Sequence, residues 1–221
     1  MKHIPLLLLL TFALGGIGLL ESCSNDDESF PNLITEMGVA YSDAQGRMTR
    51  FLTDGGKAYQ VLNEVKGMEN NDTARVLTGY VIESSTTAKV YTAQAVPVLH
   101  NATEQELAEG TYYDPTGVES AWTAGGFVNL HLTPKTQGKK QAWAFKCDTT
   151  YTNTQGGQSY ALSLCHRQLE DPTAYTTDIY VSVDLDSVAT AFAPTDSLHF
   201  TVYSFDGPRT WHFGQLTPRR H

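Results

Sequence analysis

The stretch Asp178-Ile179-Tyr180-Val181-Ser182-Val183-Asp184-Leu185 decides the fold class of the chain. Its branched apolar residues recur at every second position, and this period of two is typical of a β-strand with one buried face and one solvated face. Strands of this kind belong to antiparallel sheets, because the strands of a parallel sheet are covered on both faces and are apolar throughout. The stretch therefore predicts an antiparallel sheet that packs one face against a core.

Similar segments lie on both sides of this strand. Short runs rich in β-branched and aromatic residues alternate with Gly, Asn, Asp and Pro, which is the pattern of strands joined by turns. A helix is expected only at residues 103–109, where Thr103 and Glu106 match a capping box. The chain is therefore predicted to be all-β, with strands at residues 38–41, 48–52, 58–62, 75–82, 90–99, 126–133, 141–148, 160–166, 178–185, 198–205 and 210–213.

The spacing of these strands divides the chain into two domains. The short strands within residues 30–99 suit a small OB-like β-barrel. The later strands have longer connections and suit an immunoglobulin-like antiparallel β-sandwich over residues 118–217. Residues 100–117 are expected to link the two domains.

The first residues have the features of a lipoprotein signal peptide. A positive charge at Lys2 precedes a mostly apolar run over residues 4–20, and the Leu-Glu-Ser-Cys sequence that ends at Cys23 resembles a lipobox. Removal of residues 1–22 would leave Cys23 as the first residue, acylated with chains such as palmitate. The alternative is an uncleaved membrane anchor, but the run is shorter than the ~20 apolar residues of a span and contains Pro5 and several glycines.

An acidic tether follows the lipobox. Residues 23–29 carry three carboxylates and, after Cys23, no apolar side chain, so this segment has nothing with which to form a core. It resembles the acidic export signal of surface-exposed lipoproteins in Gram-negative gut anaerobes, and a plain solvated spacer is the alternative. We expect a lipid-anchored protein of the outer membrane, exposed at the cell surface, whose membrane contact is the N-terminal lipid.

The charge balance excludes one class of partner. Fifteen Lys and Arg residues stand against 24 Asp and Glu residues, which gives a net charge of -9. Proteins that bind nucleic acid through its phosphates need an excess of positive charge. We therefore expect no nucleic-acid partner.

Two cysteines remain after Cys23. Cys147 and Cys165 flank a predicted hairpin almost opposite each other, and an extracellular location permits a disulfide. Strict alternation, however, places them on opposite faces of the hairpin, so that a bulge would be needed to bring them together. A disulfide and two buried free thiols therefore both remain open. A structural zinc site is disfavoured because further ligands are missing at the required spacing.

Catalytic and metal-binding motifs are not found in the sequence, and we expect no catalytic residue, metal or cofactor. Asp184 and Asp186 share a strand face and could serve glycoside hydrolysis or calcium binding, although a solvated strand face explains the same spacing. The histidines of the mature chain lack a repeated metal spacing. They are His100, His131, His166, His199, His212 and His221.

Aromatic residues offer candidates for a ligand-facing surface. Tyr112, Tyr113 and Trp122 lie in a connecting segment, where exposed rings could stack on a sugar, although packing at the domain junction is the alternative. Trp143 and Trp211 lie in strand patterns and are expected in the core. Four short triplets also resemble bacterial O-glycosylation acceptors, at residues 72–74, 148–150, 186–188 and 196–198.

Several stretches together resemble NigD-like lipoproteins. The resemblance rests on the leader with Cys23 and on residues 37–41, 51–56, 75–80, 124–132, 162–166 and 178–185. It implies an N-terminal OB-like domain followed by an immunoglobulin-like sandwich. The family name comes from a bacteriocin operon, for which an immunity role was proposed, and it supplies no site residue. The chain departs from the expected pattern at Cys147, at Cys165 and in residues 218–221.

These observations lead to one expected function and two alternatives. We expect a non-catalytic outer-membrane lipoprotein that serves as a surface binding or adhesion module for an unknown glycan or protein ligand. The first alternative is a bacteriocin-immunity-type lipoprotein. The second is a surface hydrolase that uses carboxylates such as Asp184 and Asp186.

Overall fold

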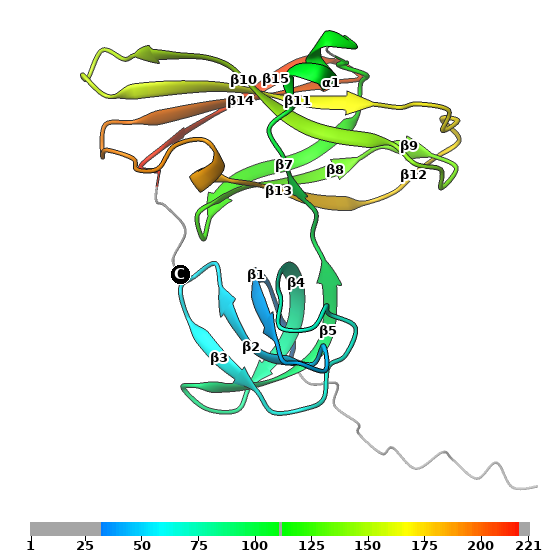
Figure 1. Cartoon of the computed structure of the whole chain (residues 1–221), viewed down its shortest axis with the longest axis vertical. Coiled ribbons are helices and arrows are strands. Elements are labelled where there is room, and N and C mark those ends of the chain that lie inside the picture. Colours follow the sequence, from blue (N-terminus) through cyan, green and yellow to red (C-terminus); the bar gives the residue numbers. More distant parts are fainter. Residues whose placement is uncertain (1–31, 111, 217–221) are drawn as a thin grey trace, which may run out of the picture. The chain divides into compact units, whose positions relative to one another are not determined.

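The computed structural model describes residues 32–110 and 112–216 (Figure 1). The predicted signal peptide and tether, with Cys23, lie outside the described residues. Within the described part of the chain, no helix is long and apolar enough to cross a membrane. The elements are β1 (Ile34–Ser42), β2 (Met48–Thr53), β3 (Ala58–Val61), β4 (Thr73–Ile82), β5 (Thr87–Ala95), β6 (Val98–Leu99), α1 (Glu104–Ala108), β7 (Gly117–Ala124), β8 (Phe127–Thr133), β9 (Lys135–Thr136), β10 (Ala142–Thr152), β11 (Gln158–Arg167), β12 (Tyr175–Thr176), β13 (Ile179–Asp184), the 3-10 helix η1 (Leu185–Ser187), β14 (Ser197–Ser204) and β15 (Gly207–Gly214).

The first five strands form a closed barrel in the order β1-β2-β3-β5-β4. β1 pairs antiparallel with both β2 and β4, and a short parallel pairing of β3 with β5 completes the closure. Phe51, Tyr59 and Tyr80 meet inside the barrel with ring centroids 4.9 to 5.6 Å apart. The predicted small barrel is therefore confirmed, and its interior is filled by aromatic side chains.

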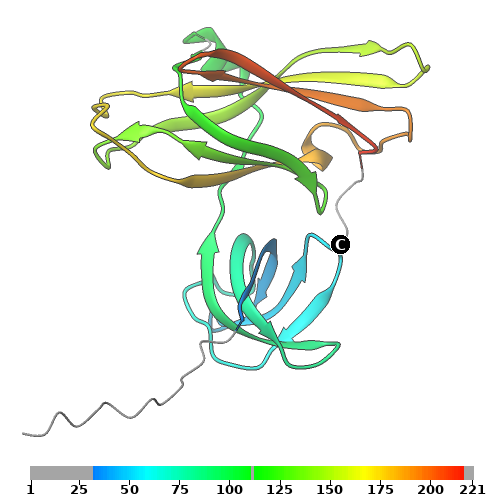
Figure 2. The ribbon, with the colours of Figure 1, turned by 180° about the vertical axis from the view of Figure 1, so that it is seen from behind.

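The later strands form a β-sandwich, as predicted. One sheet has the order β10-β11-β14-β15 and the other β6-β13-β8-β7, with a short β9–β12 pair beside them. Figure 2 shows β14 and β15, in orange and red, beside the yellow-green β10–β11 hairpin. The core between the sheets is apolar, because alternate residues of each strand point inward. Its fully buried members include Val128, Leu130, Phe145, Leu162, Val183, Leu198 and Phe200.

The strand predicted over residues 90–99 is wrong in one respect, because it divides into two. β5 ends at Ala95, and β6 joins the other domain by pairing in parallel with β13. Pro97 lies at the break, and a proline lacks the N–H that would continue a strand ladder. The predicted capping box is confirmed, since Thr103 and Glu106 bond reciprocally at the start of α1.

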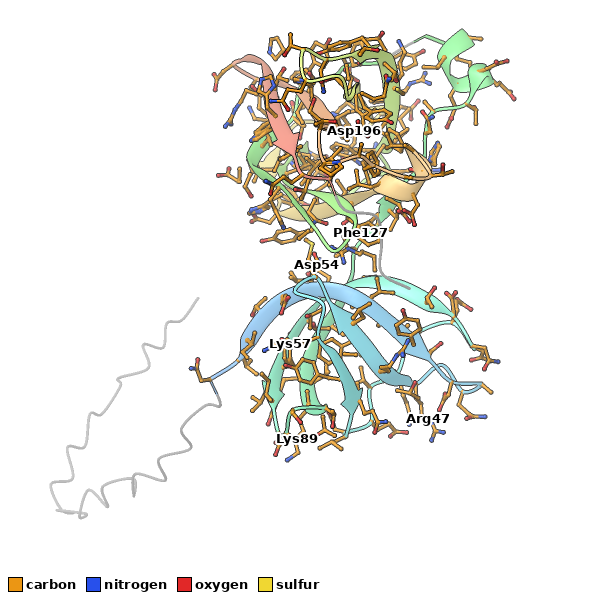
Figure 3. The ribbon with its side chains drawn as sticks, turned by 90° about the vertical axis from the view of Figure 1, so that its left-hand side faces the viewer. Arg47, Asp54, Lys57, Lys89, Phe127 and Asp196 are labelled. Atoms are coloured by element: carbon orange, nitrogen blue, oxygen red, sulfur yellow. The ribbon has the colours of Figure 1, made fainter. Side chains whose placement is uncertain are left out.

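A buried ion pair joins the barrel to the sandwich. Arg75 of β4 donates to both carboxylate oxygens of Asp54, at 2.5 and 2.6 Å, and its side chain is 1% exposed. The same guanidinium donates to Asn129 of β8 at 2.9 Å and to Ser182 of β13 at 3.3 Å. It also lies 4.1 Å from the ring centroid of Phe127, which Figure 3 labels together with Asp54. We call these five residues the Arg75 cluster, and such bidentate, charge-assisted bonds fix both partners in one geometry.

Candidate functional site

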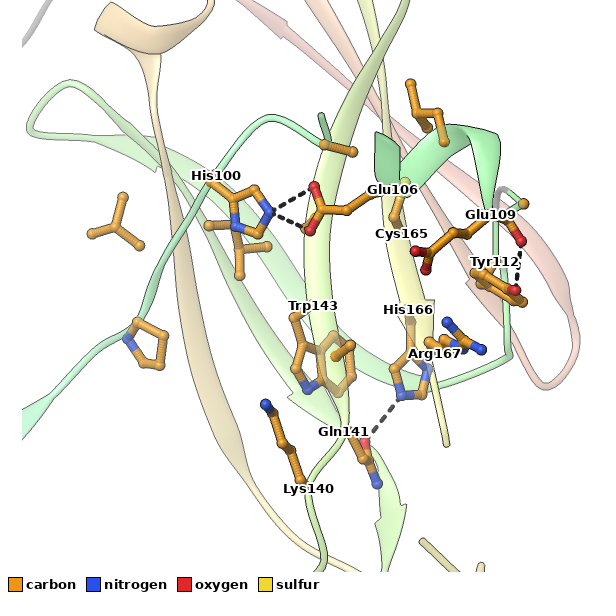
Figure 4. A pocket seen from close by; sticks show the side chains of 18 residues that line it. His100, Glu106, Glu109, Tyr112, Lys140, Gln141, Trp143, Cys165, His166 and Arg167 are labelled. Atoms are coloured by element: carbon orange, nitrogen blue, oxygen red, sulfur yellow. Dashed lines mark hydrogen bonds and ion pairs between the residues drawn. The ribbon is translucent and has the colours of Figure 1, made fainter. Parts of the chain in front are cut away.

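One candidate site is a pocket beside the edge of β10, shown in Figure 4. Its volume is about 550 Å³, within the range of small-ligand sites. Three segments form its walls: residues 97–102, the α1 region with Tyr112, and the adjoining ends of β10 and β11. We call it the β10 pocket.

A stacked ring pair forms the floor of the β10 pocket. The indole of Trp143 lies parallel to the imidazole of His166, with centroids 3.9 Å apart and an interplanar angle of 12°. His166 is 1% exposed, and its Nδ1 lies 2.9 Å from the backbone oxygen of Asp114. Its Nε2 lies 3.0 Å from the Gln141 side-chain oxygen. Burial lowers the pKa of His166, although the hydrogen bond and charge of Asp114 oppose this shift.

Gln141 is itself held by a buried carboxylate. Its amide nitrogen donates to Asp171 at 2.8 Å and to the backbone oxygen of Lys135 at 3.0 Å, so its oxygen faces His166. Burial raises the pKa of Asp171, but hydrogen bonds from Thr136, Gln137, Gln141 and Lys139 outweigh it and lower the pKa to about 2. The ionised Asp171 thus fixes the floor before any ligand arrives.

The α1 side of the pocket carries a second set of fixed groups. His100 Nε2 lies 3.0 Å from Glu106, and the pKa of Glu106 is lowered to about 2 by hydrogen bonds from the Thr103 backbone and from His100. Tyr112 donates to the backbone oxygen of Glu109 at 2.7 Å, and the Arg167 guanidinium lies 4.0 Å from the Tyr112 ring centroid. This wall therefore carries charged groups, and contacts with neighbouring residues hold Glu106 and Arg167 in position.

Two cations in the pocket lining form no ion pair with a described residue. Lys140 lines the pocket, and within the described residues no carboxylate forms an ion pair with it. Arg167 also lines the pocket and likewise forms no ion pair with a described residue, and its guanidinium lies over the Tyr112 ring. The lining of the β10 pocket therefore carries charge of both signs, Lys140 and Arg167 beside Glu106 and Glu109.

The predicted aromatic candidates are not brought together. Tyr112 lines the β10 pocket, whereas Tyr113 stacks on Tyr203 at 4.3 Å. Burial, with a smaller contribution from the charge of Asp148, raises the pKa of Tyr113 to about 12. Trp122 lines a separate pocket of about 490 Å³. The three rings therefore do not form one ligand-facing surface.

Sequence reasoning missed the floor of the β10 pocket. Trp143 was expected in the core, and it does pack against the sandwich core, but it is only partly buried and also lines the pocket. Gln141 and His166 lie at the same end of the β10–β11 hairpin, and both are polar at positions where the inward face of a strand should be apolar. Two polar residues at matching ends of a predicted hairpin are the signal that would have located this site.

The considered disulfide is not formed. Cys147 and Cys165 are both free in the structure. Cys165 lies opposite Ala144, three residues from Cys147 along β10, and the two thiols point to opposite sheet faces. A bulge does interrupt the pairing, but it lies between Cys147 and Thr149, beyond Cys147 rather than between the two cysteines, and so does not align them.

The paired-carboxylate hypothesis loses its geometric basis. The strand ends at Asp184, whose side chain caps η1 by accepting a bond from the Asp186 backbone at 3.0 Å. Asp186 therefore lies in a 3-10 helix. The prediction that Asp184 and Asp186 share a strand face is wrong. Among the described residues, no group of three or more His, Cys, Asp or Glu side chains could hold a metal ion.

The fold and this pocket define a class of two-domain, all-β proteins that combine a five-stranded barrel with a β-sandwich. The model of the NigD-like C-terminal β-sandwich domain matches residues 96–214, more than half of the chain. The chain therefore belongs to the NigD-like family, and the resemblance seen in its sequence is confirmed.

Solved structures share the fold over most of the chain. A NigD-like immunity protein from Bacteroides caccae is 24% identical, with a TM-score of 0.61 over 84% of this chain and 94% of that one. A candidate lipoprotein from Bacteroides fragilis is 11% identical, with a TM-score of 0.60 over 85% of this chain and 99% of that one. A candidate toxin-related protein from Parabacteroides distasonis is 15% identical, with a TM-score of 0.64 over 82% and 92%. No curated protein matches the chain.

Proposed function

We propose that this protein is a non-catalytic, lipid-anchored binding protein of the outer membrane, exposed at the cell surface, and that it captures a glycan or protein ligand in the β10 pocket. The observation that carries the proposal is the pocket floor. The buried imidazole of this floor, His166, stacks on Trp143, and its two ring nitrogens lie within hydrogen-bond distance of oxygen atoms of Asp114 and Gln141. A general base must reach the proton that it abstracts, and His166 is not placed to do so.

Two positively charged side chains in the pocket lining favour binding. Lys140 and Arg167 can pair with an acidic or polar ligand without first breaking an existing ion pair. The fixed floor also limits the conformational cost of binding, because Gln141 and His166 are already ordered by their hydrogen bonds.

The membrane anchor is supported by two independent features. The leader ends in a lipobox-like sequence at Cys23, and a solved structure with the same fold belongs to a candidate lipoprotein. Protease treatment of intact cells tests the location. We expect digestion of the sandwich in wild-type cells, and no cell-associated, protease-sensitive pool in a Cys23→Ala strain. Protection until the outer membrane is broken would place the protein on the periplasmic side.

The binding role is tested on the purified mature protein. An array of glycans and candidate surface proteins should yield a ligand whose binding is lost in Leu107→Arg, because Leu107 lines the pocket wall. Tyr175→Arg is the matched control, since Tyr175 is 56% exposed on β12 and does not line the pocket. A ligand that binds both variants equally would refute the pocket as its site.

A second candidate function is bacteriocin immunity. It is favoured by the B. caccae protein of the same fold, which is described as a NigD-like immunity protein. Deletion of the gene should then sensitise cells to a bacteriocin, and the wild-type gene should restore resistance. Unchanged sensitivity would remove this candidate and leave the binding role untouched.

A further inference from the structure

We propose that the β10 pocket receives an extended segment of a protein partner, which adds to the open edge of β10 at Trp143 and inserts an apolar side chain between β6 and β10. This inference rests on the proposed function, because it names the class of ligand that the same pocket binds. Four features of the described residues support it: an edge already used by the chain, an unpaired backbone, an apolar slot and an uncommitted positive charge.

The edge of β10 already accepts one short extended segment. Asn101 lies parallel to Phe145, and the Phe145 N–H donates to the backbone oxygen of His100 at 3.0 Å. The Ala102 N–H donates in turn to the backbone oxygen of Phe145 at 2.7 Å. Three residues of the linker thus form the start of an added strand on this edge.

The edge continues past this segment without a partner. In an antiparallel pair, the N–H and C=O groups of residues two apart point to the same side of the strand. Since Phe145 directs its groups to residues 100–102, Trp143 directs its own groups to the same side. The pairing with β11 supports this direction. His166, opposite Trp143, bonds away from β10, to the backbones of Tyr112 and Asp114. Within the described residues, no group bonds to the Trp143 backbone.

The residues that precede this segment, in β6, belong to the other sheet and do not continue along the edge of β10. Val98 of β6 pairs with Ser182 of β13 in the other sheet, and among the described residues β6 is not paired with β10. Pro97, next to it, has no N–H to offer. The Trp143 backbone is therefore a donor and an acceptor at the wall of a pocket, which is the arrangement that β-strand addition requires.

An apolar slot lies beside the open backbone. Val98 lines the pocket and is 46% exposed, which is high for a valine. Leu107 and the Trp143 indole line the same space. Side chains of an added strand alternate in direction, so one of them would point into this slot while the backbone pairs with Trp143.

The pocket fits a peptide better than a sugar. A sugar bound by stacking needs an aromatic face, and His166 covers one face of the Trp143 ring while Arg167 covers one face of the Tyr112 ring, which leaves each ring a single face. A sugar also has no alternating amide donor and carbonyl acceptor with which to pair a strand edge. Lys140 lines the pocket and forms no ion pair with another described residue, so it can pair with an acidic residue in the bound segment.

The test uses the mature protein and a phage library of random twelve-residue peptides. We expect selected peptides to contain an acidic residue beside alternating apolar ones, and a synthetic copy to protect the Trp143 amide from hydrogen exchange. N-methylation of the peptide residues that pair with Trp143 should weaken binding at least tenfold, because it removes ladder bonds while keeping the side chains. Val98→Lys should weaken binding similarly, whereas Val98→Ala and the control Tyr175→Lys should bind within about threefold of wild type.

The outcomes separate this inference from the proposed function. A peptide affinity that N-methylation does not change would overturn strand addition. So would a bound peptide that does not protect the Trp143 amide from hydrogen exchange. A glycan that binds through Leu107 while no peptide is selected would leave the proposed function standing and refute the peptide. Protection of the Trp143 amide that grows with protein concentration alone would show that a second copy occupies the edge, and would likewise overturn the proposal. The absence of any ligand at the pocket would refute both.

Discussion

Replacement of Asp54 by Asn tests the Arg75 cluster, whose central charge is buried. The substitution keeps the size of the side chain but removes its negative charge. Arg75 would then remain buried, 1% exposed in its side chain, with only neutral partners in Asn129 and Ser182. Loss of one partner from a buried ion pair typically costs ~3–5 kcal/mol, because the other charge remains uncompensated. We expect Asp54→Asn to reduce the free energy of unfolding by this amount.

A urea titration followed by two signals measures the loss. All three tryptophans, Trp122, Trp143 and Trp211, belong to the sandwich, so fluorescence mainly follows that domain, whereas circular dichroism follows both domains. Because Arg75 and Asp54 belong to the barrel but bond to the sandwich, both signals should shift to lower urea.

Two variants serve as controls for this experiment. Asp43→Asn removes the charge from a comparable pair with Arg47, whose side chains are 24% and 46% exposed, and should leave stability close to wild type. An Arg75→Met/Asp54→Asn double variant should be more stable than Asp54→Asn, since it no longer buries an unpaired charge. A loss below about 1 kcal/mol in Asp54→Asn, or a double variant that is less stable than the single one, would refute the reasoning.

Three further predictions concern the turn, the pocket and the thiols. Gly125→Ala should destabilise the protein, because Gly125 has φ +62° and an added Cβ would lie 2.3 Å from an Asp54 oxygen; an unchanged urea midpoint would contradict this. Burial lowers the pKa of His166, so the folded state binds fewer protons and stability should fall as the pH drops through about 6.5; a His166→Gln variant with the same pH dependence would disprove the assignment. Denatured, unreduced Cys23→Ala protein should titrate two thiols, from Cys147 and Cys165, and an intact mass two hydrogens lower would show a disulfide.

Local signals in the sequence predicted the fold because they depend on neighbouring residues. The alternation of Val181 and Val183 requires only that a strand have one apolar face, and both side chains are buried as expected. The capping box at Thr103 is likewise contained within four residues. Ser182 shows the limit of this reasoning. Its face of the strand was predicted to be solvated, yet it is 0% exposed because Arg75, 107 residues away, bonds to it.

The pocket escaped prediction because it depends on where separate segments meet. Trp143 has the neighbours of a core residue in sequence, and only the departure of β6 toward β13 leaves it beside a gap. The orientation of Gln141 depends on Asp171, 30 residues further along the chain. Neither contact leaves a periodic signal, whereas the polar ends of the hairpin at Gln141 and His166 did provide a local one.

The unpaired edge of β10 at Trp143 lies inside a pocket, and this position explains how the protein can keep an unpaired edge without aggregating. An unpaired strand edge ordinarily invites pairing with the edge of another sheet, and proteins protect such edges with cover, charge or proline. β15 carries Pro208 and Arg209, which are devices of this kind. At Trp143 the protection is different, since β6 and α1 enclose the edge within the β10 pocket. A whole sheet is too wide to enter a pocket of about 550 Å³, but a single extended segment is not. The same enclosure hinders edge-to-edge association and is consistent with the isolated peptide strand that we propose as the partner.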